Sequence, residues 1–149
     1  MDLKEVYKKE LLNSIPVVSA MEIDIKNVSD NSITITAPLN TNINYEGTAF
    51  GGSLNTACVL SCYLLVHHFL RKSDIKFTSL VIQNSSINYI KPVKFDFMAT
   101  SKIYQKDGLF LTKLLAKKKV GRVKVRASIN CPNSNDTLVD FQARFVVTV

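Results

Sequence analysis

Hydrophobic and polar residues repeat with two different periods along the chain, and each change of period predicts where one kind of element replaces the other. Near the start, apolar residues recur at helical spacing, and Asp2 with Glu5 has the pattern of an N-terminal capping box. We therefore predict a helix within residues 1–15, ended by Pro16.

The next segments alternate apolar and polar residues, which is typical of strands with one buried face. Residues 21–26 and 32–37 alternate in this way around a Ser-Asp-Asn turn sequence. Residues 38–52 then hold three of the five glycines in the chain. This part of the chain predicts a β-hairpin followed by a glycine-rich loop.

Residues 51–72 predict one long central helix. Their middle, Ser53 to Leu70, carries no charged residue and is apolar on nearly all sides, so it must be enclosed by protein or span a membrane. Polar residues within it, including His67 and His68, would be costly in hydrocarbon, and alternating strands follow it. We expect a buried helix rather than a transmembrane one.

Alternation resumes after the central helix and predicts four further strands. They are expected over residues 77–89, 93–104, 120–130 and a last segment that includes Phe141 to Val147. Asp107-Gly108 predicts a turn, and residues 109–116 fit either a short helix or a strand. The order predicts a mostly antiparallel sheet packed on one long helix, which is an α+β fold in a single domain of residues 1–149.

Composition and charge restrict the class of protein further. Hydrophobic residues make up 46% and charged residues 21%, as in a soluble globular domain and unlike a disordered or collagen-like chain. The net charge of +7 suits an anionic partner: a nucleic acid, a lipid surface or a phosphorylated small molecule. The three cysteines cannot all pair within the chain, and the charged N-terminal segment lacks a signal-peptide core. We therefore expect a cytoplasmic protein with reduced thiols.

The loop sequence NYEGTAFGGSL, which starts at Asn44, resembles a motif of the hotdog-fold thioesterases. Many of them carry Asn-x-x-Gly-x-x-His-Gly-Gly, of which this chain keeps Asn44, Gly47, Gly51 and Gly52, with Phe50 in place of the histidine. Weaker similarity lies in Ala37-Pro38-Leu39, Tyr89-x-x-Pro92-Val93-x-x-Asp96-Phe97 and Ala143-Arg144-Phe145-Val146. The chain resembles a bacterial thioesterase-type domain that also occurs fused behind a GNAT acetyltransferase domain.

The resemblance implies a hotdog fold, in which a curved antiparallel sheet wraps around the long central helix. It implies hydrolysis of an acyl-CoA or acyl-carrier-protein thioester at the N-terminus of that helix, without a cofactor. The implied assembly is a homodimer or a dimer of dimers, with sites between subunits. A membrane is not expected as a partner, and neither is a nucleic acid, because the basic segment has no interleaved aromatic residues.

The start of the central helix suits thioester chemistry. A helix N-terminus presents unpaired amide N–H groups and the positive end of the helix dipole. By similarity to the hotdog enzymes, the amides of Gly51 and Gly52 are candidates to stabilise the oxyanion; the alternative is that the two glycines only permit a tight loop. Asn44 could orient a carbonyl or a water, or it could brace the loop as an Asx turn.

A general base is harder to assign. Hotdog enzymes of the His-Gly-Gly type usually place an acid two turns into the helix, where this chain has Val59. Glu46 is the nearest carboxylate in sequence and the candidate base, with a solvated loop residue as the alternative, while Asp96 matches the family motif further along. The missing helix acid leaves a second function open, a non-catalytic module that binds acyl-CoA or an acyl group.

Substrate contacts on the helix side are expected from residues around its N-terminus. The candidates are Phe50, Ser53, Asn55, Thr56 and Val59. Ser53 could cap the helix instead. No metal site is expected, since His67 and His68 point about 100° apart around a helix.

A basic segment late in the chain offers partners for phosphate. Lys117, Lys119 and Arg122 are candidates to bind the phosphates of coenzyme A, as a hotdog thioesterase would use them. The alternative is a solvated strand face with a lysine-protected sheet edge.

Overall fold

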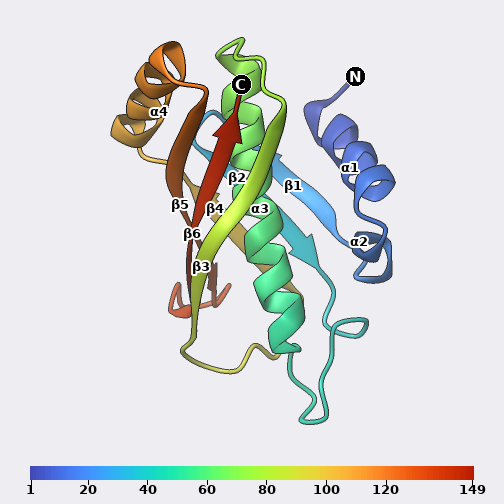
Figure 1. Cartoon of the computed structure of the whole chain (residues 1–149). Helices are drawn as coiled ribbons and strands as arrows, with labels where there is room; N and C mark the ends of the chain where they lie inside the picture. Colours follow the sequence, from blue (N-terminus) through green and yellow to red (C-terminus); the bar gives the residue numbers. More distant parts are fainter.

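A curved antiparallel sheet wraps around one long helix in the computed structural model, which describes residues 1–149 (Figure 1). The helices are α1 (Leu3–Ser14), α2 (Val17–Ala20), α3 (Gly51–Lys72) and α4 (Gln105–Lys117). The strands are β1 (Asp24–Val28), β2 (Ser32–Ala37), β3 (Ser79–Tyr89), β4 (Phe97–Lys102), β5 (Val120–Asn130) and β6 (Thr137–Thr148). The predicted α+β hotdog fold is confirmed.

The sheet has six strands in the order β1-β2-β4-β5-β6-β3, and every neighbouring pair is antiparallel. β1 and β2 form the predicted hairpin, with Ile25 opposite Ile35. The two edges are β1 and β3. Since β3 has 11 residues and pairs only with β6, its other side presents a long row of free backbone groups.

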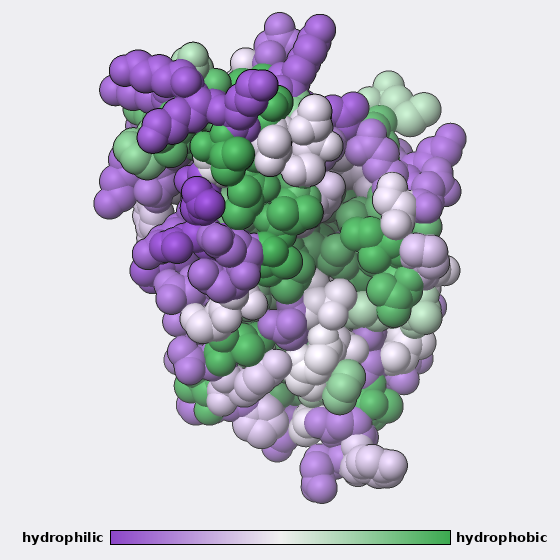
Figure 2. All heavy atoms as spheres, in the orientation of Figure 1, coloured by the Kyte–Doolittle hydropathy of each residue, from purple (hydrophilic) through white to green (hydrophobic).

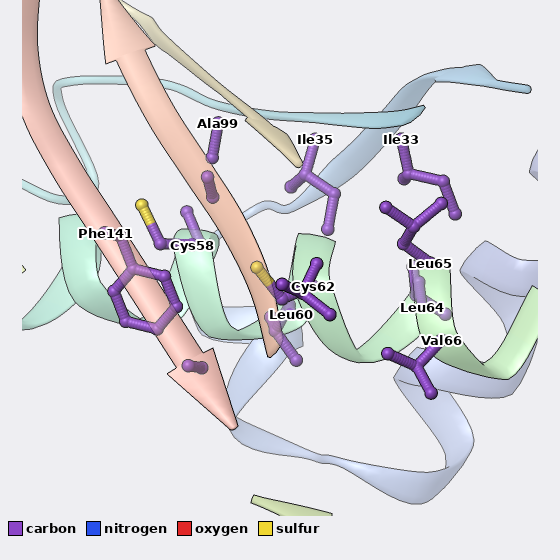
Figure 3. Close-up of a cluster of buried hydrophobic side chains, with 14 of the residues drawn as sticks. Ile33, Ile35, Cys58, Leu60, Cys62, Leu64, Leu65, Val66, Ala99 and Phe141 are labelled. Atoms are coloured by element: carbon purple, nitrogen blue, oxygen red, sulfur yellow. The ribbon is translucent and has the colours of Figure 1, made fainter. Parts of the chain in front are cut away.

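α3 lies on the concave face of the sheet and supplies much of the core. Cys58, Cys62 and Leu65 have no exposed surface. Figure 3 shows them lying near Ile33, Ile35, Ala99 and Phe141 of strands β2, β4 and β6. Burial raises the pKa of the Cys58 thiol to about 12, so this thiol stays neutral. All three cysteines are unpaired, as expected.

One face of α3 is left partly open. Its half-buried residues are Asn55, Thr56, Val59, Tyr63 and His67, which recur at intervals close to one turn and which we call the open face. Figure 2 shows apolar side chains near the middle of this view, where Figure 1 shows α3 and β3. The helix is long and apolar enough to cross a membrane, yet 61% of its most apolar window is buried inside the protein. Most of α3 therefore serves as core.

α4 differs from the prediction at its start. The expected turn at Asp107-Gly108 is wrong, because both residues lie inside this helix, and the preceding strand already ends at Lys102. Of the two alternatives for residues 109–116, the helix is correct. A Cβ on Gly108 would lie 2.8 Å from the ring of Phe69 on α3, so Gly108 allows the two helices to approach rather than the chain to turn.

The N-terminal helices complete the layer beside α3. The expected cap of α1 is confirmed, since the Asp2 carboxylate accepts a hydrogen bond of 3.2 Å from the Lys4 amide. Beyond Pro16 a single helical turn, α2, takes the chain to the sheet and was not predicted. Tyr7 of α1 is buried and hydrogen-bonds through its hydroxyl to Nδ1 of His68 at 2.8 Å. This bond places α1 against one side of the C-terminal half of α3.

Candidate functional site

The loop before α3 is held in shape by Asn44. Its side-chain oxygen accepts hydrogen bonds from the amides of Glu46 at 2.9 Å and Thr48 at 3.0 Å. Its side-chain nitrogen donates to the Thr48 hydroxyl at 2.9 Å and to the Ala49 carbonyl at 3.5 Å. The amide group is thus fully used within its own loop. Of the two alternatives for Asn44, this geometry is that of a loop brace.

A second asparagine, Asn42, anchors the loop to the rest of the protein. Its side chain is 3% exposed and donates to the carbonyls of Met21 at 3.0 Å and Pro38 at 2.8 Å. Its own carbonyl accepts from the Phe50 amide at 2.7 Å. Asn42 therefore fixes the residue that starts α3. The sequence gives no signal for this role, because Asn42 is one of several polar residues in a glycine-rich loop.

The N-terminus of α3 carries free amide groups. Phe50 is the N-cap residue, and no side chain caps the helix. The expectation that Ser53 could cap it is wrong, because the helix begins at Gly51 and Ser53 is buried within its first turn. The first intrahelical bond runs from the Leu54 amide to the Phe50 carbonyl, which leaves the amides of Gly51, Gly52 and Ser53 without a protein partner. This end of the dipole is open to an anion or an oxyanion.

Two aromatic rings lie against the two glycines. A Cβ on Gly52 would clash with the ring of Phe50, the residue that replaces the histidine of the motif this loop resembles. A Cβ on Gly51 would lie 3.4 Å from the ring of Tyr89, whose hydroxyl donates to the Gly51 carbonyl at 2.9 Å. Partial burial raises the pKa of Tyr89, so its hydroxyl remains a donor near neutral pH. The N-terminus of α3 is thus lined by Phe50 and Tyr89.

Tyr89 is a site residue to which the sequence assigned no role. It ends β3 and is half exposed, at 51%. The only sequence signal was its place in the weak Tyr-x-x-Pro motif. Its position beside Gly51 depends on the pairing of β3 with β6, which the sequence did not specify.

The other helix candidates divide between two faces of α3. Asn55, Thr56 and Val59 lie on the open face, next to one another, while Ser53 is only 8% exposed and points into the protein. The Thr56 hydroxyl donates to the Gly52 carbonyl at 2.9 Å, inside the helix. Further along this face lies a cavity of about 590 Å³. It is lined by Glu10, Leu11, Ser14, Ile15, Tyr63, Leu64, His67, Arg71 and Phe77.

The two carboxylate candidates have different surroundings. Glu46 is exposed in the loop, and its side chain has no partner within the chain. Asp96 instead accepts a hydrogen bond of 2.8 Å from the Leu39 amide, so it braces the start of the same loop. Val59 occupies the position where the resemblance led us to look for an acid, and α3 contains no Asp or Glu. Glu46 is the carboxylate of this loop that remains unengaged.

The basic candidates lie at the opposite end of the molecule. Lys117, Lys119 and Arg122 belong to the end of α4 and the start of β5, beside the C-terminal part of α3. A 22-residue helix is about 33 Å long, so one chain does not bring these cations to Gly51 and Gly52. The alternative of a lysine-protected edge is wrong for β5, because this strand lies between β4 and β6. The three side chains are exposed on the sheet and helix surface.

Solved structures from several bacteria share the fold of this chain. A protein "with unknown function" from Chlorobaculum tepidum superposes with a TM-score of 0.91 at 23% identity, covering 98% of this chain and 94% of that one. A "putative thioesterase" from Shewanella oneidensis gives a TM-score of 0.83 at 21% identity, covering 99% and 98%. A "hypothetical thioesterase" from Streptococcus pneumoniae, solved with coenzyme A, gives 0.62 at 24% identity, covering 88% and 90%.

Sequence comparison assigns the family. No curated protein matches the chain. The model of the family described as "Putative thioesterase (yiiD_Cterm)" matches residues 4–149, which is nearly the whole chain. The expected resemblance is confirmed over the loop, the helix and the strands together. The chain therefore belongs to this family of thioesterase-type hotdog proteins.

Proposed function

We propose that the protein hydrolyses acyl-CoA thioesters at the N-terminus of α3. The observation that carries the proposal is the set of three amides, of Gly51, Gly52 and Ser53, that have no partner in the chain. When water attacks a thioester, negative charge develops on the carbonyl oxygen. Amides already fixed at the positive end of a helix dipole would stabilise that charge more than they stabilise the substrate.

The surrounding residues have distinct roles in this proposal. The Gly51 and Gly52 amides bind the oxyanion, and Asn44 holds the loop that aims them. Phe50, Asn55, Thr56 and Val59 contact the thioester and the start of the acyl group. Ser53 contributes its backbone amide, since its side chain is buried. Glu46 takes the proton from the attacking water, because it is the loop carboxylate without another bond.

We further propose that the site is completed in a homodimer paired along β3. The whole of β3 lacks charged residues and proline, the devices that usually protect an exposed edge, and Val81 on it is 54% exposed. α3 lies beside β3 (Figure 1), and its open face is only half-buried. A second copy that adds its β3 antiparallel would cover both.

The dimer also gives the basic residues a place in the proposal. In an antiparallel pairing about a two-fold axis, the Ser79 end of one β3 lies beside the Tyr89 end of the other. Lys117, Lys119 and Arg122 lie toward the Ser79 end of β3. At this end, Ser79 pairs with the end of β6, and the end of β6 pairs with the start of β5. They would therefore approach the Gly51 end of the second copy, on the side where the phosphates of coenzyme A leave the site. An acidic carrier protein is the other thioester source that such cations suit.

A panel of acyl-CoAs of increasing chain length, with release of free thiol as the readout, tests the hydrolysis. We expect turnover of at least one member and a loss of about 10²–10⁴-fold in kcat for Glu46→Gln. Glu5→Gln, which removes an exposed carboxylate from α1, is the matched control and should leave kcat unchanged.

The second candidate function is favoured by one observation, the absence of any acid on α3. A binding module of the same fold would be stabilised by coenzyme A or acyl-CoA in a thermal shift assay without releasing thiol. Neither turnover nor stabilisation with any acyl-CoA would contradict both functions. Sedimentation that gave a monomer with full activity would contradict the proposed dimer site.

A further inference from the structure

α4 has an inner face that packs as expected for an amphipathic helix. Gly108 contacts Phe69, and Leu111 and Leu115 contact the backbone of β5 at Gly121, where a Cβ would lie 2.8 Å from Leu111. Leu111 is fully buried by these contacts. The apolar residues that α4 needs for docking on the protein are therefore all on one side.

An amphipathic helix that is docked by one apolar face usually has a polar opposite face. The outer face of α4 differs, because it carries large apolar residues as well as lysines. Lys106, Leu109, Phe110, Lys113 and Lys117 project within about 100° of one another around the helix axis. Leu109 and Phe110 are 55% and 61% exposed, and neither belongs to the buried core. Along the helix axis the two large apolar residues lie between Lys106 and Lys113 on one exposed face, which we call the α4 outer face.

The charge around this face is one-sided. Of its three lysines none takes part in an ion pair, and the ion pairs of the protein all involve residues of α1, β1, α3 or the β1–β2 turn. Phe110 lines one side of a pocket of about 260 Å³ together with Arg122, Lys124 and Arg144, and Asp107 is the one acid there. Lys124 and Arg144 are also directly opposite each other in the sheet, an unfavourable pairing of like charges. The protein holds this positive charge without compensating it internally.

The charge decides between possible occupants of the α4 outer face. A second copy of the chain bound about a two-fold axis would place the same lysines against one another, which is repulsive. The face is also convex, because α4 projects at one corner of the molecule (Figure 1) and Figure 2 shows hydrophilic side chains gathered there. A nucleic acid would use the lysines but would leave Leu109 exposed. A flat anionic surface with an apolar layer beneath matches all five residues.

We propose that α4 binds the surface of an anionic lipid bilayer, with Leu109 and Phe110 inserted between the headgroups. Lys106, Lys113 and Lys117 would lie along the interface, with their apolar stems toward the lipid and their ammonium groups at phosphates. This proposal departs from the expectation that a membrane is not a partner. α4 lies on the bilayer and does not cross it, and the proposal is independent of hydrolysis.

Sedimentation with lipid vesicles tests this proposal. We expect the full chain to pellet with vesicles that contain phosphatidylglycerol, to stay in solution with phosphatidylcholine alone, and to be released as salt is raised. Leu109→Ser with Phe110→Ser should weaken binding by about tenfold or more, because the inserted apolar area is lost. Lys106→Gln with Lys113→Gln should weaken it roughly thirtyfold. Lys117 is left unchanged because it is also a candidate to bind the phosphates of coenzyme A. A loss of lipid binding in these variants is therefore not confused with a loss of acyl-CoA hydrolysis.

Matched variants elsewhere on the surface serve as controls. Leu3→Ser with Val17→Ser removes two apolar residues of comparable exposure, 47% and 60%, from α1 and α2. Lys9→Gln with Lys94→Gln removes two exposed lysines that lack ion pairs. Both controls should bind vesicles as the unaltered chain does.

Four results would overturn the proposal. The first is no binding to anionic vesicles, and the second is an equal loss of binding in the controls. The third is a fall in oligomeric mass caused by Leu109→Ser with Phe110→Ser, since it would show that a second copy covers this face. Tighter binding to an acidic protein or a nucleic acid than to vesicles, lost in the lysine variant alone, would also count against it.

Discussion

The two ends of α3 are built in opposite ways. At the C-terminal end, Arg71 pairs with Glu10 at 3.0 Å and Lys72 pairs with Asp30, so cations complement the dipole and are themselves neutralised. At the N-terminal end there is no acidic residue in the first turn and no side-chain cap. We call the C-terminal end of α3 the closed end, because ion-paired cations compensate the dipole there. We call the N-terminal end the open end, because its partial positive charge has no partner in the chain.

Packing follows the same division. Near the C-terminal end, His68 is 7% exposed, hydrogen-bonds to Tyr7 and is covered by α1. Near the N-terminal end, Gly51 and Gly52 reach the surface, with only the rims of two aromatic rings beside them. A helix end that is left uncapped forgoes up to about 1 kcal/mol of stability that a Ser, Thr or Asp cap would provide. The C-terminal end of α3 therefore contributes to stability, whereas the N-terminal end keeps the free amides on which the proposed function rests.

Among changes at the two ends of α3, the largest effect is expected from removing one amide at the N-terminal end. Gly51→Pro deletes the Gly51 N–H at the first position of the helix, which proline favours. The preceding residue, Phe50, already has the extended conformation that proline requires, with φ −63 and ψ 131. The helix should therefore form, while kcat for an acyl-CoA substrate should fall by about 10²–10³-fold, or roughly 2.7–4 kcal/mol in the barrier.

Gly51→Ala is the control for that variant, because it adds a Cβ and keeps the amide. The added carbon would lie 3.4 Å from the Tyr89 ring, an ordinary contact. We expect kcat of the alanine variant within a few-fold of the unaltered protein. Equal losses in both variants would show that shape rather than the amide matters at Gly51.

The next largest effect is expected at the closed end, and on stability rather than turnover. Tyr7→Phe removes the partner of a buried His68 nitrogen, which should cost about 1–3 kcal/mol and lower Tm by several degrees. Adding His68→Leu removes the unsatisfied group as well, so the double variant should lose less than the sum of the two single losses. Activity measured well below Tm should be retained. A loss of turnover with an unchanged Tm would contradict the inference that this end of α3 contributes to stability and not to activity.

Much of the fold could be predicted from alternation alone. Val123, Val125 and Ala127 alternate with charged or polar residues and do face the core from β5. α4 was harder, because Gly108 carries the signal of a turn while its actual role is to accommodate Phe69. A contact between residues far apart in sequence leaves no local pattern. The same reason hides the pairing of β3 with β6, which brings Tyr89 to the helix start.

The site was predictable where it depends on the backbone and not where it depends on side-chain packing. The glycines at a helix N-terminus follow from the order of loop and helix in the sequence, and the structure places free amides there. The ring of Phe50 over Gly52 and the anchoring by Asn42 follow only from the folded loop. Lys117 is far from Gly51 because Lys117 lies beside the C-terminal part of α3, whereas Gly51 starts this helix. A single straight helix keeps its two ends apart.

The smallest effect is expected from pH, and again only at the closed end. Burial lowers the pKa of both His67 and His68 below the ordinary value of 6.5, so the native state disfavours their protonated forms. The unfolded state then binds more protons just below pH 6.5, and stability that is fully present above this value is lost as the pH falls toward the native pKa values. We expect Tm to decrease between about pH 6.5 and pH 5, before the carboxylates titrate. The Tm of a variant with His67→Gln and His68→Gln should change less with pH in this range. An unchanged slope would mean that these rings, and hence the covering of this end of α3, do not contribute to stability as their burial indicates.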